Sequence, residues 1–144
     1  MHTGSLAVTF ALSACCVLGA ATAADLPRSP SPKGVELYFI SPEDGETVTS
    51  PVTVRFGLRG MGVAPAGLAM ENTGHHHLLI DSEPPAFNIP IPADANHVHF
   101  GKGQTEAQVT LAPGKHTLRL LLADHLHIPH DPPVMSKPVT VIVK

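Results

Sequence analysis

Histidine is the residue type in this chain with the clearest capacity for chemistry, and its spacing is regular. Ten histidines occur in 144 residues, and nine of them lie between His75 and His130. Six form three His-x-His pairs, at positions 75/77, 97/99 and 125/127. In a strand, residues two apart leave the same face about 7 Å apart, so each pair can present two imidazoles to one ion. Because neutral imidazole suits zinc, copper, iron and nickel, this spacing indicates a transition-metal site.

The first histidine cluster, in residues 74–81 (GHHHLLID), predicts a strand with two different faces. His75 and His77 share one face, while His76 shares the other face with Leu78 and Ile80. We therefore expect His76 to point into the core and to hydrogen-bond there, which leaves His75 and His77 as the better ligand pair. The opposite assignment stays open, because a leucine also shares the face of the pair.

The other two pairs lie in segments of different character. His97 and His99 open a short extended segment, whereas residues 124–131 (DHLHIPHD) form a proline-containing loop with a carboxylate at each end. A carboxylate beside a ligating histidine commonly orients its ring and raises its basicity. The proposed metal ligands are His75, His77, His97, His99, His125, His127 and His130, and the groups that would orient them are Asp124, Asp131 and His76.

Two further sets of possible ligands are better explained by structure. His116 follows a Pro-Gly turn and shares its face with three leucines, which is typical of a core or edge histidine. Met61, Met70 and Met135 could offer thioether sulfur to Cu(I). Scattered methionines more often fill gaps in a core, so neither set is assigned to the site.

The N-terminal residues 1–23 are predicted to be a cleaved signal peptide. Residues 6–20 are mostly apolar or small, and Ala21-Thr22-Ala23 gives a small-x-small cleavage pattern before Ala24. We therefore expect a periplasmic or secreted protein. A second interpretation is that Leu12-Ser13-Ala14-Cys15 is a lipobox, and only lipidation at Cys15 would tie the protein to a membrane; the apolar run that continues past Cys15 favours ordinary secretion. Both cysteines lie in this segment, so the mature chain would have no thiolate ligand and no disulfide.

The remaining chain predicts a single all-β domain. Residues 24–33 form a Pro/Ser-rich spacer that we expect to be extended and poorly ordered, and residues 34–144 form one His-rich domain. About seven short strands with turns between them and no helix predict an immunoglobulin-like antiparallel β-sandwich. Because loops gather at the ends of a sandwich, the three pairs can meet at one end. The expected strands cover residues 35–40, 48–58, 75–81, 97–100, 106–111, 115–123 and 138–143.

Charge and aromatic content exclude some classes of partner. Nine Lys and Arg against twelve Asp and Glu give a formal charge of −3 with no basic patch, so nucleic acid is not an expected partner. The chain has no Trp and one Tyr, which argues against an aromatic-lined groove for sugars or peptides.

Several of these runs together resemble a known family of small exported bacterial proteins that carry a domain of unknown function numbered 4399. The resemblance covers about residues 34–144 and implies an exported β-sandwich domain. It implies no established activity and supplies no catalytic residues. The runs that carry it are 61–67 (MGVAPAG), 73–81 (TGHHHLLID), 99–106 (HFGKGQTE), 113–118 (PGKHTL) and 124–133 (DHLHIPHDPP).

A shorter run, residues 97–101 (HVHFG), is similar to the metal-binding His-Val-His of copper–zinc superoxide dismutases, which are also β-sandwiches. The similarity covers five residues, and the cysteines of the dismutase disulfide are missing here. Dismutation is therefore a minor alternative.

The sequence thus predicts an exported cell-envelope module that stores, delivers or buffers copper or zinc, with a metal ion and an envelope protein as partners. One alternative is an interaction module without metal, whose histidines are structural or sense pH. A further alternative is a metal-dependent enzyme with Glu106 or Asp81 as the base. Because no hydrolase triad or nucleophile elbow is present in the spacing, an enzyme is the least favoured.

Overall fold

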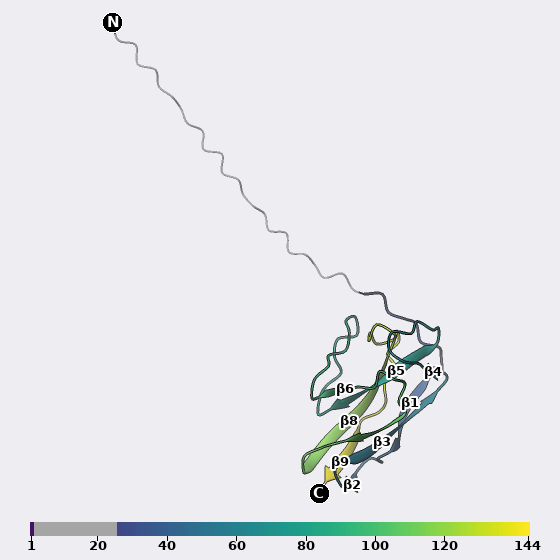
Figure 1. The fold of residues 1–144 in the computed structure, drawn as a ribbon, viewed down its shortest axis with the longest axis vertical. Coiled ribbons are helices and arrows are strands. Elements are labelled where there is room, and N and C mark those ends of the chain that lie inside the picture. The colour runs from purple at the N-terminus through teal and green to yellow at the C-terminus, as the bar shows by residue number, and fades with distance from the viewer. Residues whose placement is uncertain (2–25) are drawn as a thin grey trace.

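The structure is a computed structural model that describes Met1 and residues 26–144. The predicted signal peptide, its cleavage site and Cys15 lie outside the described residues. Within the described part, the chain is all-β and has no helix (Figure 1). Among the described residues there is accordingly no helix that is long and apolar enough to cross a membrane.

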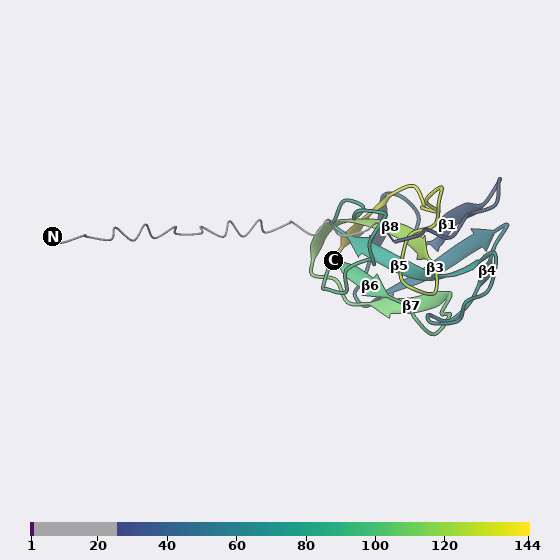
Figure 2. The same cartoon turned by 90° about the horizontal axis from the view of Figure 1, so that it is seen from above.

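The described chain forms two sheets that pack face to face, seen from two directions in Figures 1 and 2. The smaller sheet has the order β1-β3-β7, and the larger has the order β2-β9-β8-β5-β4, with β6 paired to β5. The strands are β1 (Glu36–Ser41), β2 (Glu46–Val48), β3 (Val52–Arg59), β4 (Gly62–Val63), β5 (Thr73–Ile80), β6 (His97–His99), β7 (Glu106–Val109), β8 (Gly114–Ala123) and β9 (Val139–Val143).

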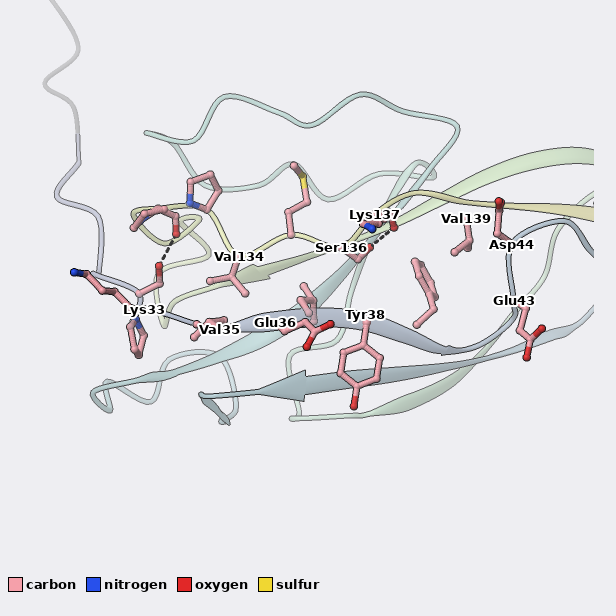
Figure 3. A pocket seen from close by; sticks show the side chains of 18 of the residues that line it. Lys33, Val35, Glu36, Tyr38, Glu43, Asp44, Val134, Ser136, Lys137 and Val139 are labelled. Atoms are coloured by element: carbon pink, nitrogen blue, oxygen red, sulfur yellow. Dashed lines mark hydrogen bonds between the residues drawn. The ribbon is translucent and has the colours of Figure 1, made fainter.

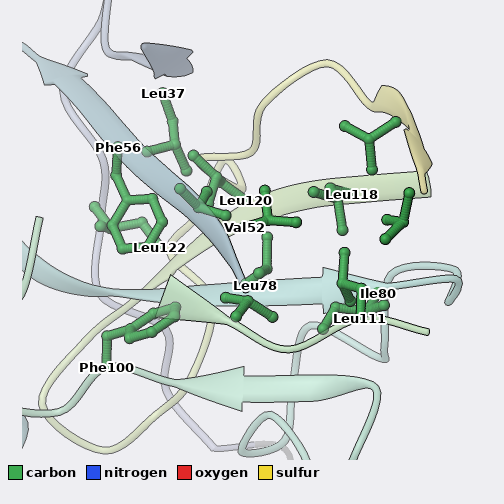
Figure 4. Packing of buried hydrophobic residues seen from close by; sticks show 14 of the residues in the cluster. Leu37, Val52, Phe56, Leu78, Ile80, Phe100, Leu111, Leu118, Leu120 and Leu122 are labelled. Carbon is green, nitrogen blue, oxygen red and sulfur yellow. The ribbon is translucent and has the colours of Figure 1, made fainter. Parts of the chain in front are cut away.

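The hydrophobic core between the sheets follows from alternation along the strands. In β3, Val52, Val54 and Phe56 point inward from the smaller sheet, and they meet the inward faces of β5 and β8. Figure 4 shows Phe56 beside Phe100 and Leu122. Side chains two apart lie on the same face of a strand, so one alternating pattern in each strand builds the core.

The second face of β5 and β8 is also covered, which makes these two strands unusual for a sandwich. Every residue of β5 after Thr73 is buried. On this outer face Leu79, Leu121 and Ala123 pack with Ile91 from the proline-rich segment between β5 and β6. The proline-rich segment therefore acts as a third layer over the larger sheet.

The predicted β-sandwich is confirmed as a sandwich-like all-β fold, with two departures in detail. The described residues hold nine strands where we expected about seven: β2 ends where the expected strand 48–58 begins, and β4 lies between two expected strands. These two strands also pair in parallel, β2 with β9 and β4 with β5, so the sheets are not wholly antiparallel.

The segment expected to be a poorly ordered spacer is instead tied to the domain. Ser31 N donates to Asp131 O at 2.9 Å, and Asp131 N donates to Ser29 O at 2.9 Å. Arg28 Nε donates to Pro129 O at 3.0 Å, and its guanidinium pairs with Asp131 at 3.2 Å. We refer to residues 28–31 as the N-terminal strap. The composition of this segment gave a wrong prediction of disorder. A Pro/Ser-rich segment has few backbone amides, but these can still donate to the carbonyls of another proline-rich segment and so order both.

A large groove lies away from the histidines. It has a volume of about 680 Å³ and runs along β1, between that strand and residues 132–139 (Figure 3). Its walls combine Tyr38 and Val139 with the charged Lys33 and Glu43, and no histidine lines it. The size of this groove therefore does not indicate where the histidines lie.

We predict that the core depends on full burial of the leucines of β8. Leu120→Ala should lower the free energy of unfolding by about 2–5 kcal/mol, because Leu120 has no exposed surface and its loss leaves a cavity. Leu126→Ala is the matched control, since Leu126 is 49% exposed and should change stability by less than about 0.5 kcal/mol. Urea denaturation of both variants tests this, and equal losses would contradict it.

Candidate metal centre

Four imidazole rings gather on the outer face of the larger sheet. His75 contacts the rings of His77, His99 and His127 at centroid distances of 4.8, 5.0 and 4.9 Å. The remaining distances are 5.1 Å for His77–His99, 4.8 Å for His99–His127 and 6.1 Å for His77–His127. We call these four rings the imidazole cluster. Nitrogens of His75, His77 and His99 all lie within 4.8 Å of one another, so this triad could hold a metal ion.

The register of β5 with its neighbours explains why three of the rings meet. His75 and His77 are two residues apart on β5 and leave the same face. Opposite His77, β6 places His99 as its cross-strand partner. On the other side, β8 pairs Ala123 with His75 and Leu121 with His77. Because these two β8 residues are apolar, His75 and His77 have no polar cross-strand partner in that strand.

The fourth ring comes from the turn after β8. Residues 124–128 form a tight turn, which we call the His127 loop, in which Asp124 N donates to Ile128 O at 2.9 Å and His127 N donates to Asp124 O at 3.0 Å. His127 itself has φ of +66°, a left-handed conformation that is uncommon for a residue with a side chain. Such a conformation costs on the order of 1–3 kcal/mol and persists only where its surroundings enforce it.

Glycine makes room for the most exposed ring of the cluster. A Cβ on Gly101 would lie 2.3 Å from His99 Cε1 and 2.6 Å from His99 Nε2. The imidazole of His99 therefore lies directly against the Gly101 backbone, and any larger residue there would push it aside. Steric constraints thus explain the order of residues in His99-Phe100-Gly101: Phe100 turns into the core, and Gly101 leaves room for the His99 ring.

Burial keeps the inner imidazoles neutral. His75 and His77 are each only 1% exposed. Burial, followed by the neighbouring histidines, lowers the pKa of His75 to about 4 and the pKa of His77 to about 2. The pKa of the more exposed His99 is also lowered, by burial and then by His127. At neutral pH these rings therefore carry free lone pairs, which is the form that binds metal ions.

Several buried ring nitrogens in the described structure have no hydrogen-bond partner. They include both nitrogens of His75 and Nδ1 of His77. A buried polar group without a partner costs about 1–3 kcal/mol, and native structures have few of them. Three such atoms at one place, all on rings that face each other, need an explanation.

The structure separates His97 from the cluster, although it shares a face with His99. His97 pairs across the strand with Leu79 rather than with a histidine. Its Nδ1 lies 2.8 Å from Asp94 Oδ1, and its Nε2 lies 3.4 Å from the Ser82 hydroxyl. Both ring nitrogens are thus engaged in the loop between β5 and β6, so the His-Val-His run does not supply two converging ligands, as the dismutase similarity had suggested.

The third pair is also divided. His127 joins the cluster, whereas His125 lines a separate polar hollow beside Ser29 and Glu71. His130 is buried, and its Nε2 donates to Thr73 O at 3.1 Å. The sequence placed this pair in a proline-containing loop, and because the chain turns at His127, residues two apart do not share a face.

Two of the three residues expected to orient the ligands do not lie at the cluster. His76 points into the core, as its parity predicts, and its ring packs on Phe56 at a centroid distance of 4.9 Å. The hydrogen bond expected there is supported only in part: neither ring nitrogen has a partner in normal hydrogen-bond geometry among the described residues, although the backbone of Gln104 acts on the ring as a hydrogen-bond partner. Burial lowers its pKa to about 4, although the backbone of Gln104 opposes this. Asp131 pairs with Arg28 at the surface instead.

Asp124 does support the cluster, through the backbone of the His127 loop. Its Oδ1 accepts from Leu126 N at 2.9 Å and from Ile128 N at 3.1 Å, and its Oδ2 accepts from the Ser29 hydroxyl at 2.7 Å. Its pKa is lowered, because these hydrogen bonds outweigh the opposing effect of burial. Asp124 is thus a buried anion that holds the turn around His127.

The candidate bases of the enzyme alternative are engaged elsewhere. Glu106 pairs with Arg55 at 2.6 Å in the smaller sheet. Asp81 lies 2.6 Å from His116 Nδ1 and accepts from Thr117 N. His116 is thus a hydrogen-bonded edge histidine, whose other nitrogen donates to Ala112 O at 2.8 Å. Neither carboxylate is therefore free to act on water at the imidazole cluster.

Comparison with known families agrees with the sequence resemblance. The family model described as Domain of unknown function (DUF4399) matches residues 54–144. This chain belongs to that family. The match begins inside β3, so it covers every ring of the cluster but leaves β1, β2 and the N-terminal strap outside, where the sequence resemblance had reached back to about residue 34. Searches of curated proteins and of solved structures found no match.

We predict that acid destabilises the metal-free protein. A folded pKa below the ordinary 6.5 means that the unfolded chain binds more protons, so stability should fall as pH drops from about 6.5 toward 4. Each unit of pKa difference is worth about 1.4 kcal/mol, so the expected loss is on the order of a few kcal/mol. His116, whose pKa is raised by Asp81, acts in the opposite direction. Melting temperatures between pH 7.5 and 4.5, measured with a chelator, test this, and a flat profile would contradict it.

Proposed function

We propose that this protein is an exported metal-binding module of the cell envelope that stores, delivers or buffers zinc or copper. The ion would be bound by the imidazoles of His75, His77 and His99. The ring of His127 would close the site as the fourth ligand.

The observation that carries this proposal is the set of buried nitrogens without partners. His75 and His77 are nearly inaccessible to water, both nitrogens of His75 and Nδ1 of His77 have no hydrogen-bond partner, and one nitrogen of each ring lies within 4.8 Å of a nitrogen of His99. No acidic side chain lies in this triad, and the rings are neutral. One ion that accepts a lone pair from each ring would give one nitrogen of each ring a partner, which no single hydrogen bond could do.

The ring spacing favours a tetrahedral ion. Four imidazoles around one ion at Zn–N lengths of about 2.0–2.1 Å would have centroids roughly 5 Å apart in all six pairs. Five of the six observed distances lie between 4.8 and 5.1 Å, and only His77–His127 is longer, at 6.1 Å. A square-planar arrangement, typical of Cu(II), needs two long opposite pairs. Zinc is thus the better match, and copper the second choice.

Storage, delivery or buffering suits a site with one open side. His99 is exposed and His127 is half-exposed, while the other two ligands are buried. An ion could therefore enter and leave past the two outer rings without opening the core. Export rests on the N-terminal sequence pattern, and delivery implies a partner protein in the envelope. The site offers no group to act as nucleophile or base, and we assign no catalytic residue.

The test is metal titration of the purified protein without a histidine tag. The wild type should bind one Zn(II) per chain with a dissociation constant of micromolar or lower, and binding should weaken in acid because protons compete for the rings. His99→Ala should weaken binding at least tenfold. His97→Ala, on the same strand but outside the imidazole cluster, is the matched control and should bind as the wild type does.

Isothermal titration with Zn(II) and Cu(II) gives the affinities, and circular dichroism confirms that each variant is folded. Equal binding by the two histidine variants would show that the ion is not held at the imidazole cluster. No stoichiometric binding by the wild type would overturn the proposal and favour the interaction module with structural histidines.

A further inference from the structure

We infer that Ser29 of the N-terminal strap positions His127 as the fourth ligand. The strap would thereby determine whether a bound ion is coordinated by four imidazoles or by three. This inference rests on the proposed metal site and extends it to residues outside the family match. It assigns a role in metal coordination to a segment that contains no ligand.

The first link is a direct contact between the strap and the buried carboxylate. The Ser29 hydroxyl donates to Asp124 Oδ2 at 2.7 Å, and Asp124 is only 3% exposed. The other oxygen of Asp124 is already used by two backbone amides of the His127 loop. Removing the hydroxyl would leave a buried carboxylate oxygen short of a donor, which is costly for a charged group.

The second link runs from the carboxylate to the ring. Asp124 accepts from the amides on both sides of His127, and its carbonyl accepts from His127 N. On the outer side, Ile91 N donates to His127 O at 2.9 Å. These four bonds enclose a residue at φ of +66°, a conformation that would relax if they loosened. The side-chain direction of His127 is thus set by its surroundings and not by its own preference.

The third link fixes the strap to the loop and to the covering layer. Arg28 donates to Pro129 O and His130 O, just beyond the His127 loop. Its guanidinium also lies over the ring of Phe87, 5.7 Å from the centroid, in the proline-rich segment that carries Ile91. The strap therefore joins the two segments that hold His127 from either side.

These contacts predict a specific effect on the ion. With the strap in place, the ring of His127 lies beside those of His75 and His99 and would complete a set of four imidazoles around the ion. With Ser29 removed, His127 can swing away, and water would take the vacated position on an ion that His75, His77 and His99 still hold. Coordination, and not folding, should change.

The experiment compares Ser29→Ala with Ser31→Ala in the purified protein. Both remove a strap hydroxyl, but the Ser31 hydroxyl donates to Pro132 O and does not touch Asp124. Co(II) is the spectroscopic probe, because a four-coordinate tetrahedral Co(II) ion absorbs visible light far more strongly than a five- or six-coordinate one. Ser29→Ala should lose much of this band and bind Zn(II) about tenfold more weakly, while Ser31→Ala should match the wild type.

A double-mutant cycle with His127→Ala separates positioning from general loosening. Once His127 is gone, adding Ser29→Ala should cause no further loss of Zn(II) affinity. His125→Ala, in the same loop but outside the imidazole cluster, should leave both the affinity and the Co(II) spectrum unchanged.

The outcomes distinguish this inference from the proposed function. A wild type that binds neither Zn(II) nor Co(II) overturns both. Strong wild-type binding that His127→Ala does not weaken, or a Ser29→Ala spectrum equal to that of the wild type, overturns the strap's role and leaves the three-histidine site standing. Additive losses in the double mutant would mean that Ser29 acts on the fold in general, which also overturns it.

Discussion

The structure depends on the pairing register of β5, whose two faces carry different chemistry. One face contributes Leu78 and Ile80 to the core between the sheets, and the other presents His75 and His77 to the covering loops. Because the side-chain period of a strand is two, a slip of one residue would exchange the faces. It would turn His75 and His77 into the core and move Leu78 and Ile80 to the outer face. The same register sets His77 opposite His99, so core and imidazole cluster are specified together.

The two buried imidazoles of the cluster, His75 and His77, lower the stability of the metal-free fold. Both nitrogens of His75 and Nδ1 of His77 have given up hydration without gaining hydrogen bonds, and His127 adds backbone strain. The leucines of β8 and the layer of proline-rich loop offset this cost. Such an arrangement is typical of functional sites, where local stability is exchanged for a preformed arrangement of ligands. At this site, therefore, the residues conflict with the local requirements of the fold, through ring nitrogens without partners and a left-handed backbone at His127.

The sequence predicted side-chain positions correctly within strands, where the two-residue period sets the face of each residue. It was misleading in turns, where contacts with other parts of the chain set the side-chain direction. Parity along β5 predicted the faces of His75, His76 and His77, and the strand pattern predicted the sandwich. It could not separate His97 from His99, because that depends on which β5 residue lies opposite each one, a non-local fact. Nor could it choose His127 over His125, since the left-handed turn is held by Asp124 within the loop and by Ile91 from another segment. The strap was missed for the same reason.

The proposed ligands come from three distant stretches of chain: β5, β6 and the loop after β8. No cysteine follows Cys16, so nothing covalent joins these stretches. An ion held by the imidazole cluster would serve as a reversible cross-link, closing two loops of the chain and reducing the freedom of the unfolded state. Stability would then rise with the logarithm of the free metal concentration. In an environment rich in proteases, the lifetime of the protein would become a measure of how much metal surrounds it.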